Sequence, residues 1–403
     1  MIRRSILALL SAAIVLPSAL SAQQMTVAMV EDMVLAAPEL PAGGDIVRVE
    51  NRSDERFVDF VIGPLDLPAD MGHLRPPIQV AEIPVDGWLQ GFEVTMEDGA
   101  GSALPMDLLH HVNFIDPDKR DLFAPIARRV IAAGRETREK KLPSLLGYPI
   151  EAGDRMIISS MFANPIGTDV PEAYLRVRIF YSLEEDGFMQ PRDVYPFYLD
   201  VMGPVGAKDF AVPPGKTVRA YEASPVIEGR ILGIGGHLHD YATVLRLEDV
   251  TEGKVLWEAE PEYDSEGRLT GVSESILLMS GGIKVTPDHT YRIYVEYENP
   301  MAHPTPDGGM GEIGGVIWAS KDVVWPELRR DDPIYVADLI NTLEAPEKAG
   351  GHGGHGDHGG MEMDAMDHCQ MDHGRMDHGT MSSGDQASEP AHEHGAAEEH
   401  DGR

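Results

Sequence analysis

Two histidines separated by a single residue, His237 and His239, lie in the glycine-rich run 235–240. Side chains at positions i and i+2 of a β-strand point to the same face of the sheet, so both imidazoles can bind one metal ion. Imidazole suits several transition metals, so the identity of the ion has to come from elsewhere in the chain. The spacing therefore predicts a metal site on a strand in the second half of the chain.

A second histidine pair, His110 and His111, consists of direct neighbours between two apolar segments. Neighbouring side chains on a regular strand point to opposite faces, so the ordinary interpretation is one buried and one exposed histidine. A β-bulge or the end of a strand would be needed to bring both rings to one ion. Three further histidines, His73, His289 and His303, are isolated in the sequence, which favours surface or hydrogen-bonded roles.

The chain beyond Glu347 changes abruptly to Gly, His, Met, Asp and Glu. Nine of the 16 histidines lie between His352 and His400, with six methionines among them. Thioether sulfur favours Cu(I) and imidazole suits both copper oxidation states, so copper explains the mixture better than nickel or zinc. A tail that only solubilises the protein through its acidic residues is the remaining alternative. On both interpretations the composition of the tail predicts disorder without metal. The tail residues predicted to bind copper are His352, His355, His358, Met366, His368, Met371, His373, Met376 and His378.

Residues 1–22 have the form of a secretory signal peptide, with paired arginines, an apolar segment and small residues before the cleavage point. No other segment is long and apolar enough to span a bilayer, which predicts a soluble periplasmic or secreted protein. The 33 basic and 67 acidic residues give a net charge of −34, which argues against nucleic acid and anionic lipid as partners. The single cysteine, Cys369, lies in the tail, so no disulfide within the chain stabilises the core.

The chain from Met25 to about Trp325 consists of short strand-like segments broken by Pro, Gly and Asp, which predicts an all-β protein of antiparallel β-sandwiches. The segment 118–140 carries apolar residues at helical spacing and is predicted as one surface helix. We expect a signal peptide at 1–22, β-sandwiches at 23–200 and 201–335, and a linker with the metal-binding tail at 336–403. The clearest predicted strands are 56–62, 174–181, 243–247 and 291–297.

A series of short motifs between Asp86 and Ser320 resembles the copper monooxygenase family that includes peptidylglycine α-hydroxylating monooxygenase and dopamine β-monooxygenase. Each motif is weak alone, and the order and spacing make the set more specific. The resemblance implies two tandem jelly-roll-like domains, each of which holds one copper ion. The motifs, in order, are Asp86-Gly87-Trp88, His110-His111, Met161-Phe162-Ala163-Asn164-Pro165, Val212-Pro213-Pro214-Gly215-Lys216, His237-Leu238-His239, Tyr297-Glu298-Asn299-Pro300 and Gly308-Gly309-Met310.

In the second domain of that family, a His-x-His pair and a distant methionine hold the copper at which O2 reacts. The resemblance therefore implies that His237, His239 and Met310 are the ligands of this copper. Met301 is a rival to Met310, although the two glycines before Met310 fit the family better. His303 lies nearest to Met310 in the sequence among the isolated histidines and could support the same site.

In the first domain of the family, a His-His pair and a later histidine hold an electron-transferring copper. The resemblance implies that His110 and His111 are two of these ligands. Met161 stands where the family has the third histidine. The site is therefore either a His/His/Met set that favours Cu(I) or a damaged one.

The substrate side departs further from the family. The peptide-amidating members carry an arginine where Gly235 stands here, and Asn and Tyr where Glu312 and Gly314 stand, so a peptidylglycine substrate is not expected. The expected function is a copper-dependent monooxygenase that acts on C–H bonds with O2 and an external reductant such as ascorbate. The alternative is a non-enzymatic protein that stores, scavenges or delivers copper, with a copper-delivery or acceptor protein as partner. A purely structural β-sandwich with fortuitous histidines is the third possibility.

Overall fold

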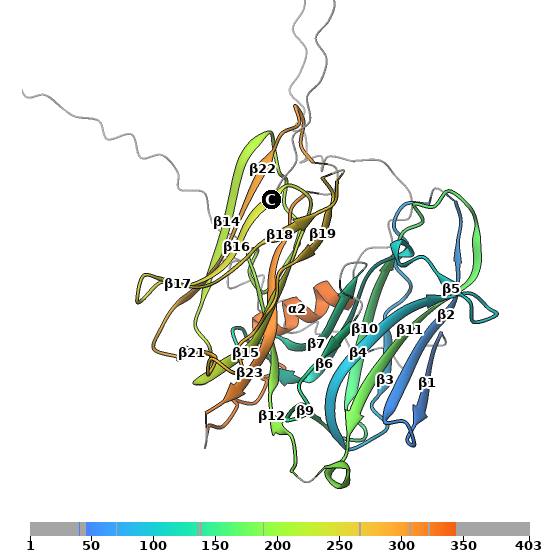
Figure 1. Cartoon of the computed structure of the whole chain (residues 1–403), viewed down its shortest axis with the longest axis horizontal. Helices are drawn as coiled ribbons and strands as arrows, with labels where there is room; N and C mark the ends of the chain where they lie inside the picture. Colours follow the sequence, from blue (N-terminus) through green and yellow to red (C-terminus); the bar gives the residue numbers. More distant parts are fainter. Residues whose placement is uncertain are drawn as a thin grey trace, which may run out of the picture. The chain divides into compact units, whose positions relative to one another are not determined.

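A computed structural model describes residues 40, 46–69, 71–134, 137, 139–187, 189–265, 267–305, 308–320 and 323–343. The described chain is mostly β-strand and contains one α-helix (Figure 1). This agrees with the predicted all-β class. All four of the clearest predicted strands are present, within β2, β11, β16 and β22. The predicted signal peptide lies outside the described residues, as does the tail.

The first half forms a β-sandwich of one eight-stranded sheet and one four-stranded sheet. The larger sheet has the order β1-β2-β11-β4-β9-β12, with β5 and β8 also paired to β4, and the smaller has the order β3-β10-β6-β7. All pairs are antiparallel except β12 with β9. The strands are β1 (Val47–Arg52), β2 (Phe57–Leu67), β3 (Gln79–Glu82), β4 (Gly87–Glu97), β5 (Ala103–Leu104), β6 (Leu109–Arg120), β7 (Ala127–Gly134), β8 (Glu139–Lys141), β9 (Leu146–Ile150), β10 (Arg155–Phe162), β11 (Val170–Ser182) and β12 (Arg192–Asp193), with short 3-10 turns η1 (Met106–Leu108) and η2 (Glu184–Asp186).

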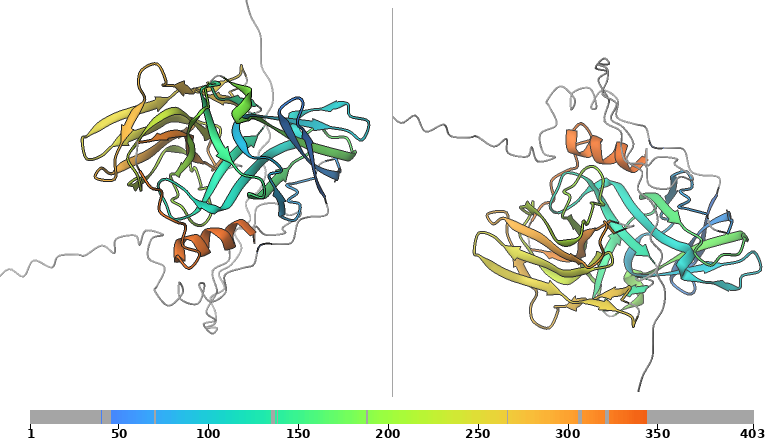
Figure 2. Two further views of the ribbon diagram at one scale, coloured as in Figure 1. Left: turned by 90° about the horizontal axis from the view of Figure 1, so that it is seen from below. Right: turned by 90° about the horizontal axis from the view of Figure 1, so that it is seen from above.

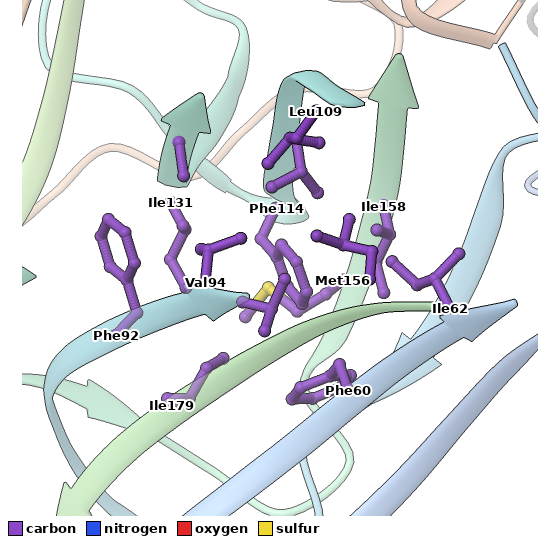
Figure 3. Close-up of a cluster of buried hydrophobic side chains, with 14 of the residues drawn as sticks. Phe60, Ile62, Phe92, Val94, Leu109, Phe114, Ile131, Met156, Ile158 and Ile179 are labelled. Carbon is purple, nitrogen blue, oxygen red and sulfur yellow. The ribbon is translucent and has the colours of Figure 1, made fainter. Parts of the chain in front are cut away.

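Apolar side chains from both sheets meet in the core of this first sandwich (Figure 3). Phe60 from the larger sheet packs edge-on against Phe114 from the smaller one, with ring centroids 5.2 Å apart. On β10 the core receives Met156, Ile158 and Phe162, which are alternate residues of the strand. The residues between them therefore face away from the core.

The second half forms another sandwich, from a five-stranded sheet and a four-stranded sheet. The five-stranded sheet has the order β13-β23-β15-β20, with β21 also paired to β15, and the four-stranded sheet has the order β14-β22-β16-β17. Its strands are β13 (Tyr195–Asp200), β14 (Gly215–Ala223), β15 (Gly229–Leu238), β16 (Ala242–Asp249), β17 (Lys254–Ala259), β20 (Ser275–Ile276), β21 (Ile283–Val285), β22 (Tyr291–Asn299) and β23 (Gly311–Ala319), and β18 (Pro261–Tyr263) and β19 (Leu269–Val272) form a separate hairpin.

Strand pairing places the change between the two sandwiches just before β13. This strand pairs with β23 along its whole length, so the sheets of the second half begin at Tyr195. The Gly- and Pro-rich segment after Asp200 then connects β13 to β14 within the second sandwich.

The predicted surface helix at 118–140 is wrong. This segment contains the end of β6, a loop, and strand β7, which pairs antiparallel with β6. Leu122 and Phe123 from the loop pack into the core of the second sandwich, where Phe123 contacts the ring of Phe197. The apolar residues recur every three to four positions because the loop buries Leu122 and Phe123 in the core of the second sandwich, whereas β7 buries Ile131 in the core of the first. Pro125 in the loop also disfavours a helix.

The helix of the structure is instead α2 (Pro333–Leu343), which lies against β6 and β7 of the first sandwich (Figure 2). Asp332 caps its first turn, since the Ile334 N–H donates to Asp332 Oδ1 at 2.9 Å, and proline at the first helical position suits this start. Val336 is fully buried against Ile115 and Ile157. The outward face of the smaller sheet is thus covered at one end by α2.

A buried ion pair also fixes α2 to β7. Arg129 donates to both carboxylate oxygens of Asp338, at 2.5 and 2.8 Å, and the two side chains are 13% and 3% exposed. Burial alone would lower the pKa of Arg129, but the charge of Asp338 more than offsets this and raises it.

Among the described residues, no helix is long and apolar enough to cross a membrane.

We predict that Asp338→Asn lowers the free energy of unfolding by about 3–5 kcal/mol, because it leaves the buried Arg129 charge without its partner. The matched control is Asp331→Asn, which breaks an ion pair with Arg329 whose side chains are 72% and 65% exposed. We expect that control to change stability by less than about 1 kcal/mol. Urea denaturation of both variants measures the difference, and equal losses would contradict a structural role for the Arg129–Asp338 pair.

Candidate metal sites

The His-x-His pair lies at the end of β15, on the face of the five-stranded sheet that points away from the core. Ile234 and Leu238 point into the core, so His237 points outward. The rings of His237 and His239 are neighbours in an edge-to-face arrangement, with centroids 5.3 Å apart and planes at 88°. The two imidazoles therefore reach the same side, as the spacing predicts.

A buried tyrosine joins this pair to Met310. The hydroxyl of Tyr297, from β22, accepts hydrogen bonds from the backbone N–H groups of His239 and Met310, each at 3.0 Å. The same hydroxyl donates to the backbone carbonyl of Met310. Burial raises the pKa of Tyr297 above its usual range, so the hydroxyl keeps the proton that it donates. One side chain thus holds the main chains of two predicted ligands together.

The rival methionine, Met301, belongs to a different local arrangement. Its backbone N–H donates to Asn299 Oδ1 at 2.9 Å, and its sulfur lies 4.0 Å from the hydroxyl of Tyr241. Both methionines are partly buried. The contact through Tyr297 connects Met310, rather than Met301, to the backbone of His239, which favours Met310 as the third donor.

A carboxylate lies across the sheet from His237. Glu312 on β23 is the register partner of His237 on one side and of Asp200 on the other. Tyr198 Oη lies 2.6 Å from Asp200 Oδ2 and 3.0 Å from Glu312 Oε1, so the hydroxyl lies between the two carboxyl groups. Burial raises the pKa of Asp200 to about 6; Lys208 opposes this shift and the charge of Glu312 adds to it. Two carboxyl groups therefore lie on the outward face near His237, and Lys208 is paired with the one on Asp200.

The structure also explains why an arginine cannot replace Gly235 without rearrangement. A Cβ atom added to Gly235 would lie 2.9 Å from Cγ of Glu274. Glu274 is in turn paired with Lys140 of β8. The space beside Gly235 is thus occupied by the side chain of a carboxylate residue.

The His-His pair of the first sandwich lies at a β-bulge. On β6, His111 pairs with Met161 of β10 and Leu109 pairs with Phe162, so the register shifts at this point and His110 is the extra residue. The Nδ1 atoms of His110 and His111 are 3.3 Å apart. Of the two possibilities that the sequence left open, a bulge or a strand end, the structure has a bulge at this point, close to the start of β6.

The 3.3 Å separation suits two ligands of one ion. With imidazole nitrogen about 2.0–2.1 Å from the metal, the range known for zinc, two tetrahedral ligands are about 3.3–3.4 Å apart. The same separation allows an N–H···N hydrogen bond between the rings when one Nδ1 carries a proton. The separation is therefore compatible with a shared metal ion and with a hydrogen bond between the rings.

Met161 lies beside this pair, and its sulfur already has a partner. Its side chain is 6% exposed, and Arg75 Nε donates to Met161 Sδ at 3.0 Å. The isolated histidine His73 also lies here, with its ring centroid 4.8 Å from that of His110. Sequence reasoning missed this contact because 37 residues separate the two histidines.

The other isolated histidines have the roles predicted for them. His289 Nδ1 lies 2.7 Å from Asp249 Oδ2, and its ring stacks on Tyr291. His303 is exposed, and its Nδ1 donates to the carbonyl of Pro304 at 3.0 Å. Within the part of the chain that the structure describes, no group of three or more His, Cys, Asp or Glu side chains is already arranged to hold a metal. Each candidate site therefore needs methionine or a ring rotation for its third donor.

The sequence matches no known protein-family model and no curated protein. Solved structures with some similarity include the major capsid protein P2 from bacteriophage PM2, which is 10% identical with a TM-score of 0.32 over 66% of this chain and 100% of that chain. Another is PNGF-II, 10% identical with a TM-score of 0.34 over 64% of this chain and 66% of that one. Similarity at this level carries no information on function.

We predict that Tyr297→Phe accelerates amide hydrogen exchange at His239 and Met310 by at least about ten-fold, because it removes the hydroxyl that accepts from both N–H groups. The matched control is Tyr291→Phe on the same strand, which removes one hydroxyl contact, with Thr286 N at 3.0 Å. Each variant should lose about 1–3 kcal/mol of stability. Equal protection of His239 and Met310 in the two variants would show that Tyr297 does not hold the site.

Proposed function

We propose that this chain is a copper-binding protein of the monooxygenase type, with one copper ion in each sandwich. His237, His239 and Met310 would hold the ion in the second sandwich, and His110 and His111 would hold the ion in the first. The observation that carries this proposal is the Tyr297 hydroxyl, which fixes the backbone of Met310 to that of His239. The main chain of one histidine of the pair is thereby joined to that of a methionine far away in the sequence.

The donor chemistry favours copper over other ions. Two imidazoles with one thioether suit Cu(I), while zinc and nickel gain little from thioether sulfur. The predicted tail, which lies outside the described residues, adds the same two donor types. When bound, copper would provide the redox chemistry with O2, and an external reductant such as ascorbate would provide the electrons.

The protein's own contribution is to position the ligands. Glu312 lies across the sheet from His237 and can accept a hydrogen bond from a ring N–H, which would orient the other ring nitrogen toward the metal. The acidic neighbours also raise the local concentration of cations. Export, predicted from residues 1–22, would place these sites in the periplasm or outside the cell.

A non-enzymatic copper-handling protein is the second candidate, and one observation favours it. Glu274 occupies the space beside Gly235 where the peptide-amidating relatives carry arginine, so the family's substrate contact is absent. On this alternative the same ligands hold copper for storage, scavenging or delivery, and the partner is a copper-delivery or acceptor protein. Both candidates require copper at His237 and His239, and they differ in whether O2 is consumed.

For the enzymatic candidate, we expect copper-loaded protein with ascorbate to consume O2 and His239→Ala to lose at least about 90% of that rate, because it removes one of two imidazole ligands. The control is His289→Ala, whose histidine is bonded to Asp249 away from both sites. A copper-loaded peptide of residues 350–403 measures the background from loosely held copper. Consumption that is equal in the wild type, the His239→Ala variant and the peptide would favour the copper-handling alternative.

For the third ligand, we expect silver(I), a redox-inert substitute for Cu(I), to protect Met310 from oxidation by peroxide, because coordination occupies the sulfur lone pair that peroxide attacks. Met301 is the internal control, since it lies nearby and is similarly partly buried. Peptide mapping by mass spectrometry gives both oxidation rates in one sample. Protection of Met301 with no effect on Met310 would reverse the assignment.

A further inference from the structure

His73 lies on the same side of the first sandwich as His110 and His111, and the backbone explains why. Leu74 forms a two-bond bridge with Phe162, the last residue of β10, with both N···O distances 2.8 Å. Leu74 and Phe162 both pack on the core. The residues on either side of Leu74, His73 and Arg75, therefore point outward.

The outward face at this point carries three imidazoles in a row. The ring of His110 lies between the other two, with its centroid 4.8 Å from His73 and 5.3 Å from His111. The rings cross at 85° and 83°, so ring edges and faces alternate along the row. His73 is exposed, so its ring can turn toward the Nδ1 atoms of the pair at little cost.

The thioether at the same site is less available. The sulfur of Met161 accepts a hydrogen bond from the Arg75 guanidinium, and the side chain is 6% exposed. A metal ion at this sulfur would have to displace a cation or approach it closely, which costs electrostatic energy. Imidazole is a better ligand than thioether for Cu(II), and it also serves Cu(I).

We propose that His73 is the third ligand of the metal ion at His110 and His111, and that Met161 is a packing residue held by Arg75. This inference rests on the proposed copper site of the first sandwich, and it changes the site's donors from two nitrogens and a sulfur to three nitrogens. Such a site holds both copper oxidation states rather than favouring Cu(I). His73, which precedes the pair in the sequence, then supplies the third imidazole ligand that a methionine at position 161 does not provide.

The test is residue-specific, so it uses the full chain with its tail. Diethyl pyrocarbonate modifies free imidazole nitrogen, and peptide mapping gives the rate at each histidine with and without Cu(II). We expect copper to slow modification of His73, His110 and His111 together by at least about ten-fold, with His289 unchanged as the internal control. Protection of His110 and His111 without His73 would overturn the inference and leave the proposed copper site intact, whereas no protection of any of the three would overturn both.

Two variants separate His73 from Met161. In the presence of a competing chelator, His73→Ala should weaken protection of His110 and His111 by about ten-fold or more, a loss that the matched replacement Met161→Leu should not cause. Met161→Leu keeps the apolar volume, so it tests the sulfur rather than the packing. Weakening by Met161→Leu with no effect of His73→Ala would show that Met161 is the ligand.

Discussion

The alternation of side chains along a β-strand is the constraint on which both candidate sites depend. On β15, alternation alone sends Leu238 into the core and leaves the two flanking histidines on the same side. On β6, the same rule would separate His110 from His111, and the bulge opposite Met161 and Phe162 removes that separation. The rings of the two pairs are thus brought together by opposite means, one through regular alternation and one through an extra residue.

The two sandwiches share a plan, but their sites are not equivalent. Strands β10 and β22 occupy the same place in sheets of matching order, and each has an Asn-Pro pair at or just after its end. Asn164 and Asn299 are each 2% exposed, and their amides donate to the carbonyls of Thr168 and His303, which closes the following loops. However, the first histidine pair lies on the neighbour of β10, while the second lies on β15 in the opposite sheet. The shared fold therefore does not carry ligand roles from one half to the other.

Sequence reasoning succeeded where the information was local. The alternation of side chains along a strand predicts the four clearest strands and a common side for His237 and His239. The same alternation indicates that a bulge or a strand end is needed to bring His110 and His111 together. It failed at 118–140, because apolar spacing does not reveal that the loop around Leu122 is buried in a different core from β7. Helix α2 had a local signal, Asp332 followed by Pro333, that would have marked its start. The contact between His73 and His110 had no local signal in the sequence, because this contact depends on the β-bridge between Leu74 and Phe162.

Charge distinguishes the two sites more clearly than ligand type does. A cation that approaches His237 meets Glu312 across the sheet, with Asp200 beyond it. A cation that approaches Met161 meets the guanidinium of Arg75. Because like charges repel, the Arg75 guanidinium disfavours a metal ion at the Met161 sulfur, which favours imidazole ligands in the proposed first site. In the proposed first site, Arg75 holds the sulfur of Met161, and His73, two residues before Arg75, offers an imidazole beside His110.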